Sequence, residues 1–251
     1  MATSIEVLED AGVRSLHFGS HWIQGAMRIA RPYALELEYT REMLLPLLLR
    51  EGRRWPRHVL QIGLGAASLT KFLHRHRPAA TLTVVEIEPQ VVAAARQHFR
   101  LPDGSPQLTV VIGDGHDYLA AATREWDLIL VDGFDAKGRA GALEMLPFYC
   151  NARARLSAQG LLAANLLTRT RGVKAALDRL REAFEGRALA LPPCGSGNTI
   201  LLAAGDEPVD AACGDLAAAA RALKRDTGLN LLPTVARLTE ALAGSGGRLM
   251  I

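Results

Sequence analysis

Two periodicities of apolar residues alternate along the middle of the chain. Short apolar runs, which are typical of strands buried in a parallel sheet, lie at 58–63, 81–88, 107–114, 126–132 and 160–167. In the segments between them apolar residues recur with helical spacing, which predicts helices at 66–76, 90–99, 116–123, 142–156 and 173–184. This alternation predicts an α/β fold in which helices connect parallel strands.

The end of this series has a different pattern. Segments 188–193 and 199–205 are both strand-like, and only the residues CGSGN separate them. A parallel crossover needs about a dozen residues or more, so we expect these two strands to pair antiparallel. The expected fold is a Rossmann-like, seven-stranded and mostly parallel sheet with an antiparallel last strand. It resembles the sheet of the class I S-adenosylmethionine-dependent transferases.

The N-terminal flank predicts a small β-region. Segments 14–19 and 26–39 favour two or three short antiparallel strands, as in a β-hairpin domain, and 40–49 favours a helix. We expect residues 1–50 to form this small β-region together with its connecting helix.

The remaining residues, 51–251, are expected to form the Rossmann-like domain. Its C-terminal part, from about residue 208, is rich in Ala and Leu and predicts helices at 209–224 and 234–243. A chain of 251 residues has room for one large α/β domain with small additions.

Composition and charge exclude several classes of function. The net charge of +3 is too small to indicate a nucleic-acid or anionic-membrane partner. The three cysteines show no CxxC or Cys/His spacing, so we expect neither a disulfide framework nor a metal site. The apolar run at 43–49 is far shorter than a membrane span, and the N-terminus lacks the pattern of a signal peptide. We therefore expect a soluble, cytoplasmic protein.

Residues suited to ligand binding follow the first two predicted strands. In an open parallel sheet, ligands bind outside the carboxyl ends of the strands. Gly63 and Gly65 end the first strand and let the backbone turn tightly toward a ligand at the next helix N-terminus. Glu86 ends the second strand, where an acid suits the hydroxyls of a ribose. The alternatives are a close-packed turn for the glycines and a helix N-terminal charge for Glu86, a role that Glu88 fits better.

The next two predicted strands also end in acids. Asp114 and Gly115 follow the third strand, and Asp132 follows the fourth. Four consecutive strand ends with Gly, Glu, Asp and Asp indicate an adenosine-type nucleotide more strongly than any single motif. A nicotinamide dehydrogenase does not require both later acids, and Ser68 replaces the third glycine of its GxGxxG fingerprint. The pattern favours a sulfonium nucleotide such as S-adenosylmethionine.

Four longer blocks of sequence resemble a known family. They are VEIEPQVVAAARQHFRLP (85–102), GDGHDYL (113–119), DLILVDGFDAKG (127–138) and FYCNARARLSAQGLLAANL (148–166). They resemble the spermidine/spermine synthase family of aminopropyltransferases, and the similarity covers about residues 20–205. The resemblance implies a small N-terminal β-domain, a Rossmann-like catalytic domain and usually a homodimer or tetramer. It also implies decarboxylated S-adenosylmethionine as donor and a small-molecule amine as acceptor.

The resemblance also implies roles for single residues. The nucleoside contacts would be Gln24, Glu86, Asp114 and Gly115. Asp132 would match the catalytic base, and Asp135 the second acid, which holds the amine. Tyr39 would match a substrate-site tyrosine, although its spacing to the following Glu-Met pair is one residue longer than usual. His21 and Trp22 are further candidates for the acceptor pocket, or else ordinary packing residues.

The two acids of the segment LILVDGFDAKG (128–138) suit this chemistry. An acceptor amine with a pKa near ~10 binds as an ammonium and must lose a proton before it attacks. Asp132 would attract the cation and accept that proton, while Asp135 would hold the far side of the amine. The alternatives are a strand-end acid that caps backbone amides for Asp132 and a turn residue for Asp135.

Three features depart from the family pattern. The family's first loop is typically GGGDGG, and the aspartate that holds the donor's ammonium is replaced by Ala66. The family's Tyr-Pro-Ser-Gly segment before the last strand becomes CGSGN, with Cys194 in the place of the tyrosine. The N-terminal region is short. We therefore expect a diverged member, with two alternatives: a small-molecule methyltransferase that uses S-adenosylmethionine, and a nucleoside-binding protein without catalysis.

Overall fold

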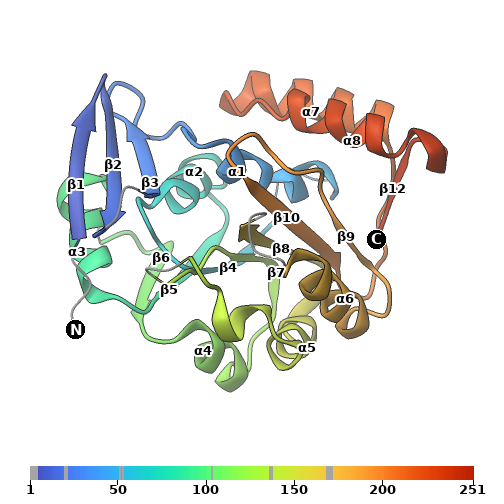
Figure 1. The fold of residues 1–251 in the computed structure, drawn as a ribbon, viewed down its shortest axis with the longest axis horizontal. Coiled ribbons are helices and arrows are strands. Elements are labelled where there is room, and N and C mark those ends of the chain that lie inside the picture. The colour runs from blue at the N-terminus through green and yellow to red at the C-terminus, as the bar shows by residue number, and fades with distance from the viewer. Residues whose placement is uncertain are drawn as a thin grey trace.

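The computed structural model of the chain describes residues 5–19, 22–50, 52, 54–102, 104–135, 138–167 and 172–251. Its central feature is a seven-stranded sheet (Figure 1). The strands are β4 (His58–Ile62), β5 (Thr81–Glu86), β6 (Leu108–Ile112), β7 (Trp126–Val131), β8 (Leu156–Leu167), β9 (Ala188–Ala190) and β10 (Asn198–Ala204).

The strand order is β6-β5-β4-β7-β8-β10-β9. Strands β4 to β8 pair parallel, whereas β10 pairs antiparallel with both of its neighbours, β8 and β9. The predicted mostly parallel sheet with an antiparallel last strand is confirmed. The short connection between β9 and β10 has no room for a crossover helix, and it imposes the reversal.

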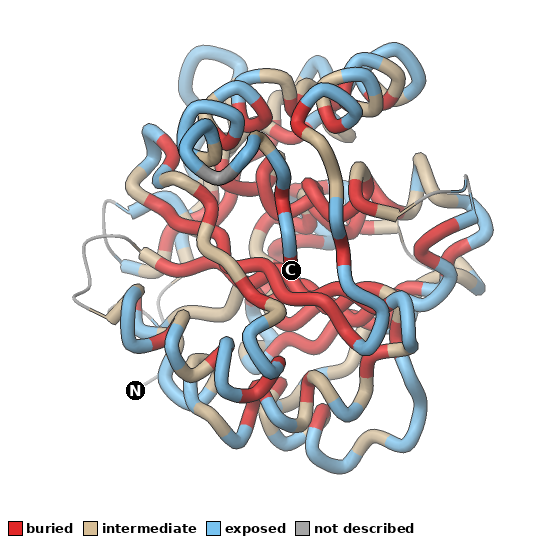
Figure 2. Tube along the Cα trace, turned by 90° about the vertical axis from the view of Figure 1, so that its right-hand side faces the viewer, coloured by how far each residue is buried: buried red, intermediate tan, exposed pale blue. Residues whose placement is uncertain are grey.

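Helices cover both faces of this sheet, which explains why its strands read as continuous apolar runs. They are α2 (Ser68–His76), α3 (Pro89–His98), α4 (Gly115–Ala121), α5 (Leu146–Ala154) and α6 (Val173–Ala183). Successive side chains of β7 point to opposite faces of the sheet. Leu128 packs on the side of α2, and Ile129 on the side of α5 and α6. Figure 2 shows the buried strands crossing the centre of the molecule, with exposed positions on the outer faces of the helices.

A three-stranded antiparallel sheet precedes the central one. It contains β1 (Ile5–Asp10), β2 (Val13–Phe18) and β3 (Ile23–Arg28). The expected antiparallel strands are confirmed, but the bounds 26–39 are wrong, because β3 covers Ile23–Arg28 and turns follow it. Strand β1 was not predicted, because half of its side chains are polar and most of them are exposed. The sheet packs on α3 and on the first strand–helix turn, where Leu16 and Met27 share a core with Leu64.

The helix predicted at 40–49 is wrong as one continuous element. The structure has a five-residue helix, α1 (Glu38–Glu42), followed by a 3-10 turn, η1 (Leu45–Leu48). Pro46 lacks the N–H that an α-helix would donate to Glu42, so the α-helix cannot continue through it. The predicted helix at 142–156 is also divided, into η2 (Gly141–Glu144) and α5, which begins at Leu146 with Pro147 in its first turn.

The C-terminal region covers one side of the sheet with helices α7 (Cys213–Thr227) and α8 (Leu232–Ala241). The predicted helix start at 209 is wrong, because β11 (Asp210–Ala212) precedes α7 and pairs with β12 (Arg248–Met250). A short turn, η3 (Ala243–Ser245), lies before β12. The division of the chain at residue 50 stays a prediction. No helix among the described ranges is long and apolar enough to cross a membrane.

Candidate active site

A cavity of about 950 Å³ opens at the carboxyl ends of strands β4, β5 and β7. It is lined by all nine residues that the sequence selected, Gln24, Tyr39, Gly63, Gly65, Glu86, Asp114, Gly115, Asp132 and Asp135. Trp22 also lines it, whereas His21 lies outside the described residues. The volume is within the range of sites that enclose a small-molecule ligand.

The first strand–helix turn requires its glycines. Gly63 has φ +88°, and a Cβ there would lie 2.1 Å from the backbone oxygen of Asp132. Gly65 has φ +52°, and a Cβ there would lie 3.0 Å from the backbone oxygen of Gln24. These two positions bring β3 and the end of β7 against the turn. The turn thus forms one wall of the cavity with its backbone exposed to a ligand.

Glu86 joins the first two strand ends. Its carboxylate accepts hydrogen bonds from the N–H groups of Leu64 (2.8 Å) and Glu88 (3.0 Å). Burial raises the pKa of Glu86, and these backbone hydrogen bonds oppose that rise. Glu88 is the N-cap residue of α3, directly before Pro89, where its charge was expected, although its side chain makes no capping hydrogen bond. The carboxylate of Glu86 is held in place at the cavity wall.

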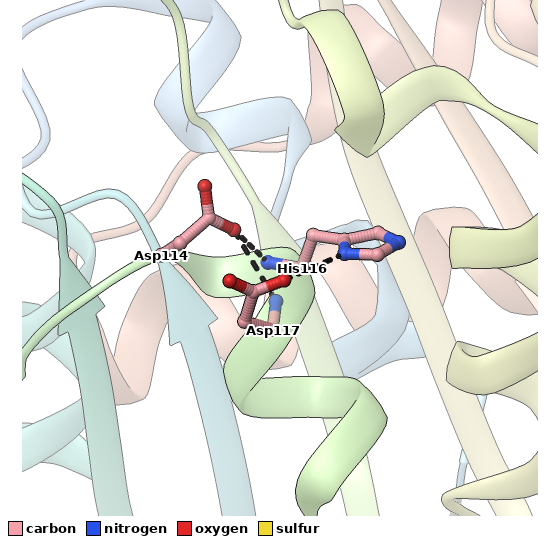
Figure 3. A group of neighbouring side chains, drawn as sticks. All are labelled: Asp114, His116 and Asp117. Carbon is pink, nitrogen blue, oxygen red and sulfur yellow. Dashed lines mark hydrogen bonds and ion pairs between the residues drawn. The ribbon is translucent and has the colours of Figure 1, made fainter.

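Asp114 is the N-cap of α4. One carboxylate oxygen accepts hydrogen bonds from the N–H groups of His116 (2.7 Å) and Asp117 (3.2 Å). The other points away from the helix (Figure 3). Ligand atoms of the three side chains lie within 4.8 Å of one another, a spacing that the capped first turn explains by itself. Asp114 thereby has a fixed orientation at the cavity.

Asp132 ends β7 and is partly exposed to the cavity. It accepts a hydrogen bond from Asn165 Nδ2 (2.9 Å) and one from the Tyr39 hydroxyl. Burial raises the pKa of Asp132 to about 6, although both hydrogen bonds favour the ionised form. The carboxylate is thus ionised at neutral pH and basic enough to accept a proton.

Tyr39 is on α1, far from Asp132 in sequence. Burial, and next the charge of Asp132, raise the pKa of Tyr39 well above its ordinary value. The phenol therefore stays protonated and remains a hydrogen-bond donor to Asp132 at neutral pH.

Two buried amides extend this hydrogen-bond system, and both were missed from the sequence. Asn165 on β8 accepts a hydrogen bond from Asn198 Nδ2 on β10 (2.9 Å), and Asn198 in turn accepts one from Ser196 Oγ (2.9 Å). Ser196 also lies 2.9 Å from the sulfur of Cys194. The signal that could have identified Asn165 is its position as a polar residue inside an otherwise apolar strand.

Asp135 lies at the cavity mouth and already has a cationic partner. Its carboxylate accepts hydrogen bonds from the backbone N–H (2.9 Å) and Nε (2.8 Å) of Arg139, which also lines the cavity. The two side chains form an exposed ion pair within one turn. Asp135 therefore combines the two alternatives that the sequence left open, a turn residue and an acid at the site.

Ala66 is not among the residues that line this cavity. It is buried against β3, and a Cβ on Gly25 would lie 2.7 Å from the Ala66 Cβ. Ala66 contributes to a side recess of only about 10 Å³, which Tyr39 and Asp132 also border. That volume is about the space of one water molecule. The close approach of Gly25 and the small recess restrict the space here for the longer acid that the family loop carries.

The sequence matches the spermine/spermidine synthase domain over residues 39–184, more than half of the chain. The chain belongs to the spermine/spermidine synthase family. It is 34% identical over 247 residues to the polyamine aminopropyltransferase of Chromobacterium violaceum, covering 98% of this chain and 94% of that one. The enzyme of the same name from Neisseria meningitidis serogroup A is 33% identical over 242 residues, covering 96% and 91%. Membership of the spermine/spermidine synthase family makes the protein a transferase, as expected.

Solved structures agree on the fold. A probable spermidine synthase from Corynebacterium glutamicum superposes with a TM-score of 0.73 at 19% identity, covering 90% of this chain and 91% of that one. Human methyltransferase-like protein 13 in complex with SAH superposes with a TM-score of 0.68 at 28% identity, covering 76% and 93%. The fold of this spermine/spermidine synthase family member is thus shared with a methyltransferase-like protein.

Proposed function

We propose that the protein transfers an aminopropyl group from decarboxylated S-adenosylmethionine to a small-molecule amine, with Asp132 as the base. The observation that carries this proposal is the environment of Asp132, a carboxylate with a raised pKa held by two hydrogen bonds at the floor of the cavity. The relatives named polyamine aminopropyltransferase support the same reaction.

The donor nucleoside is assigned to the strand ends β4 to β6. Glu86 would accept hydrogen bonds from the ribose hydroxyls, because a carboxylate has about four lone-pair sites and its backbone partners are three N–H groups, those of Leu64, Ile87 and Glu88. Asp114 would use its second oxygen for the adenine amino group. The remaining nucleoside contacts in this assignment are Gln24, Gly63, Gly65 and Gly115.

The reaction follows from the position of Asp132. The acceptor enters as an ammonium, which the Asp132 carboxylate attracts and deprotonates. The free amine nitrogen then attacks the methylene carbon that joins the aminopropyl group to the sulfonium. A C–N bond forms, the C–S bond breaks, its electron pair returns to sulfur, and methylthioadenosine leaves. Tyr39 and Asn165 hold the Asp132 carboxylate in a fixed orientation. The protein would therefore catalyse the reaction chiefly by positioning the amine against the reacting carbon.

Comparing donors directly tests this proposal. Calorimetry should show that decarboxylated S-adenosylmethionine and methylthioadenosine bind with comparable affinity. Incubating the protein with the decarboxylated donor and a diamine should release methylthioadenosine and form an aminopropylated amine, detected by mass spectrometry. If the decarboxylated donor does not bind, the aminopropyl proposal is wrong.

Methyl transfer from S-adenosylmethionine is the second candidate. One observation favours it: human methyltransferase-like protein 13 is 28% identical over the aligned part, which covers 76% of this chain. Tighter binding of S-adenosylmethionine than of its decarboxylated form, with S-adenosylhomocysteine as product, would establish this alternative. Nucleoside binding without any product would support a non-catalytic role. The homodimer stays a prediction.

A further inference from the structure

The C-terminal helix α8 contacts the short helix that carries Tyr39. Arg237 of α8 donates hydrogen bonds to Glu38 (Nη1 to Oε1, 3.1 Å) and to Glu42 (Nη2 to Oε1), one turn further along α1. The guanidinium thus spans both acids that flank Tyr39. Figure 1 shows α7 and α8 lying beside α1 on one side of the molecule.

Glu38 extends this contact to the loop before β10. Its second oxygen accepts a hydrogen bond from the backbone N–H of Gly195 (3.0 Å), and a Cβ on Gly195 would lie 3.1 Å from that oxygen. The same loop carries Ser196 and leads to Asn198, whose amide reaches Asp132 through Asn165. One carboxylate therefore joins α8 to the amide chain that ends at the proposed base.

Helix α1 depends on such contacts for its position. It has only five residues and no side-chain hydrogen bond at its N-cap, and a helix of this length has little stability of its own. Glu42 is fully buried, and its second oxygen has no hydrogen-bond partner among the described residues. Because removing charges from water offsets most of their attraction, a buried pair of this kind adds geometry more than stability.

We propose that Arg237 is a positioning residue for the reaction. It fixes α1 so that the Tyr39 hydroxyl reaches Asp132, and through Glu38 it fixes the loop at Gly195. This inference rests on the proposed role of Asp132 and deepens it. It assigns to the C-terminal helices a part in forming the acceptor side of the cavity.

The test compares Arg237→Lys with Arg221→Lys, a control on the exposed surface of α7. A lysine keeps the charge but cannot span two carboxylates as the planar guanidinium does. For Arg237→Lys we expect kcat to fall about tenfold, the effect of one weakened hydrogen bond at the base, with an unchanged KM for the donor. Arg221→Lys should leave both unchanged.

The second readout is the titration of the Asp132 carboxyl, followed by carbon NMR in aspartate-labelled protein and assigned with Asp132→Asn. In Arg237→Lys the midpoint should move to higher pH, as in Tyr39→Phe, because the ionised form loses a donor. In the double variant, Arg237→Lys with Tyr39→Phe, the two shifts of the Asp132 midpoint should not add, since both substitutions act through the hydrogen bond from Tyr39 to Asp132. Thermal unfolding and methylthioadenosine binding confirm that each variant is folded.

Gly195→Ala gives a milder perturbation of the same path, because the added methyl group presses on Glu38 without changing any charge. It should shift the Asp132 midpoint in the same direction by a smaller amount. A lower melting temperature for Arg237→Lys with an unchanged Asp132 midpoint would overturn the inference and leave a structural role. The titration does not require turnover, so an inactive wild-type protein would contradict the proposed function while this test still stands.

Discussion

The two sides of the cavity are built differently. On the side proposed for the nucleoside (the nucleoside side), Gly63 and Asp114 follow parallel strands and Glu86 ends one, and backbone hydrogen bonds hold the two acids. On the side proposed for the acceptor (the acceptor side), Tyr39 comes from a five-residue helix, and Asp135 pairs with Arg139 in a loop. The nucleoside side is fixed by the sheet itself. The acceptor side depends on side-chain contacts, one between the distant residues Tyr39 and Asp132 and one within a loop, so it can be rebuilt without changing the fold.

Asp132 lies between the two sides of the cavity, and its substitution should lower turnover more than any other change. Asp132→Asn removes the proposed base, so we expect kcat to fall by about 10³-fold or more. Methylthioadenosine affinity, a property of the nucleoside side, should change less than about threefold in calorimetry. Asp178→Asn on the exposed face of α6 is the control. Turnover retained in Asp132→Asn would remove this residue from the role of base.

The nucleoside side should be intolerant of any side chain at Gly63. Gly63→Ala places a methyl group against the backbone of Asp132, and we expect a loss of about 3 kcal/mol or more in the free energy of unfolding. Gly186 is a matched control, because it has nearly the same φ, +87°, but nothing within 4 Å of its Cβ position. Gly186→Ala should cost only the backbone strain, about 1 kcal/mol. Equal losses in urea unfolding would contradict the close-contact explanation.

Ala66 tests whether the missing acid can be restored. Because Gly25 closes the space beside it, Ala66→Asp should lower the free energy of unfolding by about 1–3 kcal/mol. It should not improve affinity for the decarboxylated donor, measured by calorimetry. Ala66→Ser, which adds one atom, is the smaller control. A gain in donor affinity with normal stability would show that the turn still accommodates the family's acid.

The pH dependence of kcat tests the hydrogen bond from Tyr39 to Asp132. Asp132 has a pKa of about 6, so its basic form is lost as pH falls through 6 and kcat should fall with it. The titratable groups that face it are Tyr39 and Glu86. In Tyr39→Phe the ionised carboxylate loses a donor, so the acid limb should move to higher pH and kcat at pH 7 should fall several-fold. An unmoved limb would mean that Tyr39 does not act on the base.

The smallest effect is expected at the cavity mouth. Arg139 and Asp135 are largely exposed, and an exposed ion pair contributes about 0.2–1 kcal/mol. Arg139→Gln should remove one cationic partner from Asp135, strengthen its attraction for the far amine of a diamine acceptor, and lower the KM of that diamine by about twofold to fivefold, with kcat unchanged. A monoamine of the same length is the control and should show no change. A higher KM for the diamine would mean that Arg139 itself helps to bind the acceptor.

Sequence-based prediction also differed between the nucleoside side and the acceptor side of the cavity. The ends of β4, β5, β6 and β7 were predictable, since strand periodicity and strand-end residues are local features and parallel strands bring their carboxyl ends together. The acceptor side was predictable only as single residues by family resemblance. Neither the Asn165–Asn198 pair nor the bridge from Arg237 to Glu38 leaves a local pattern, because their partners lie about 30 and 200 residues apart.

The sequence alone determined the α/β class and the antiparallel last strand, which follow from periodicity and connection length over short stretches. Its motifs also carried the resemblance to the family, and that resemblance supplied Gln24, Tyr39 and Asp135 among the nine selected residues that line the cavity. Only the tertiary structure decided that Asp132 is held by Tyr39 and Asn165, that Asp135 is paired with Arg139, and that Gly25 closes the space at Ala66. Burial and hydrogen bonding set the pKa of a carboxylate, and both depend on which distant segments pack around it.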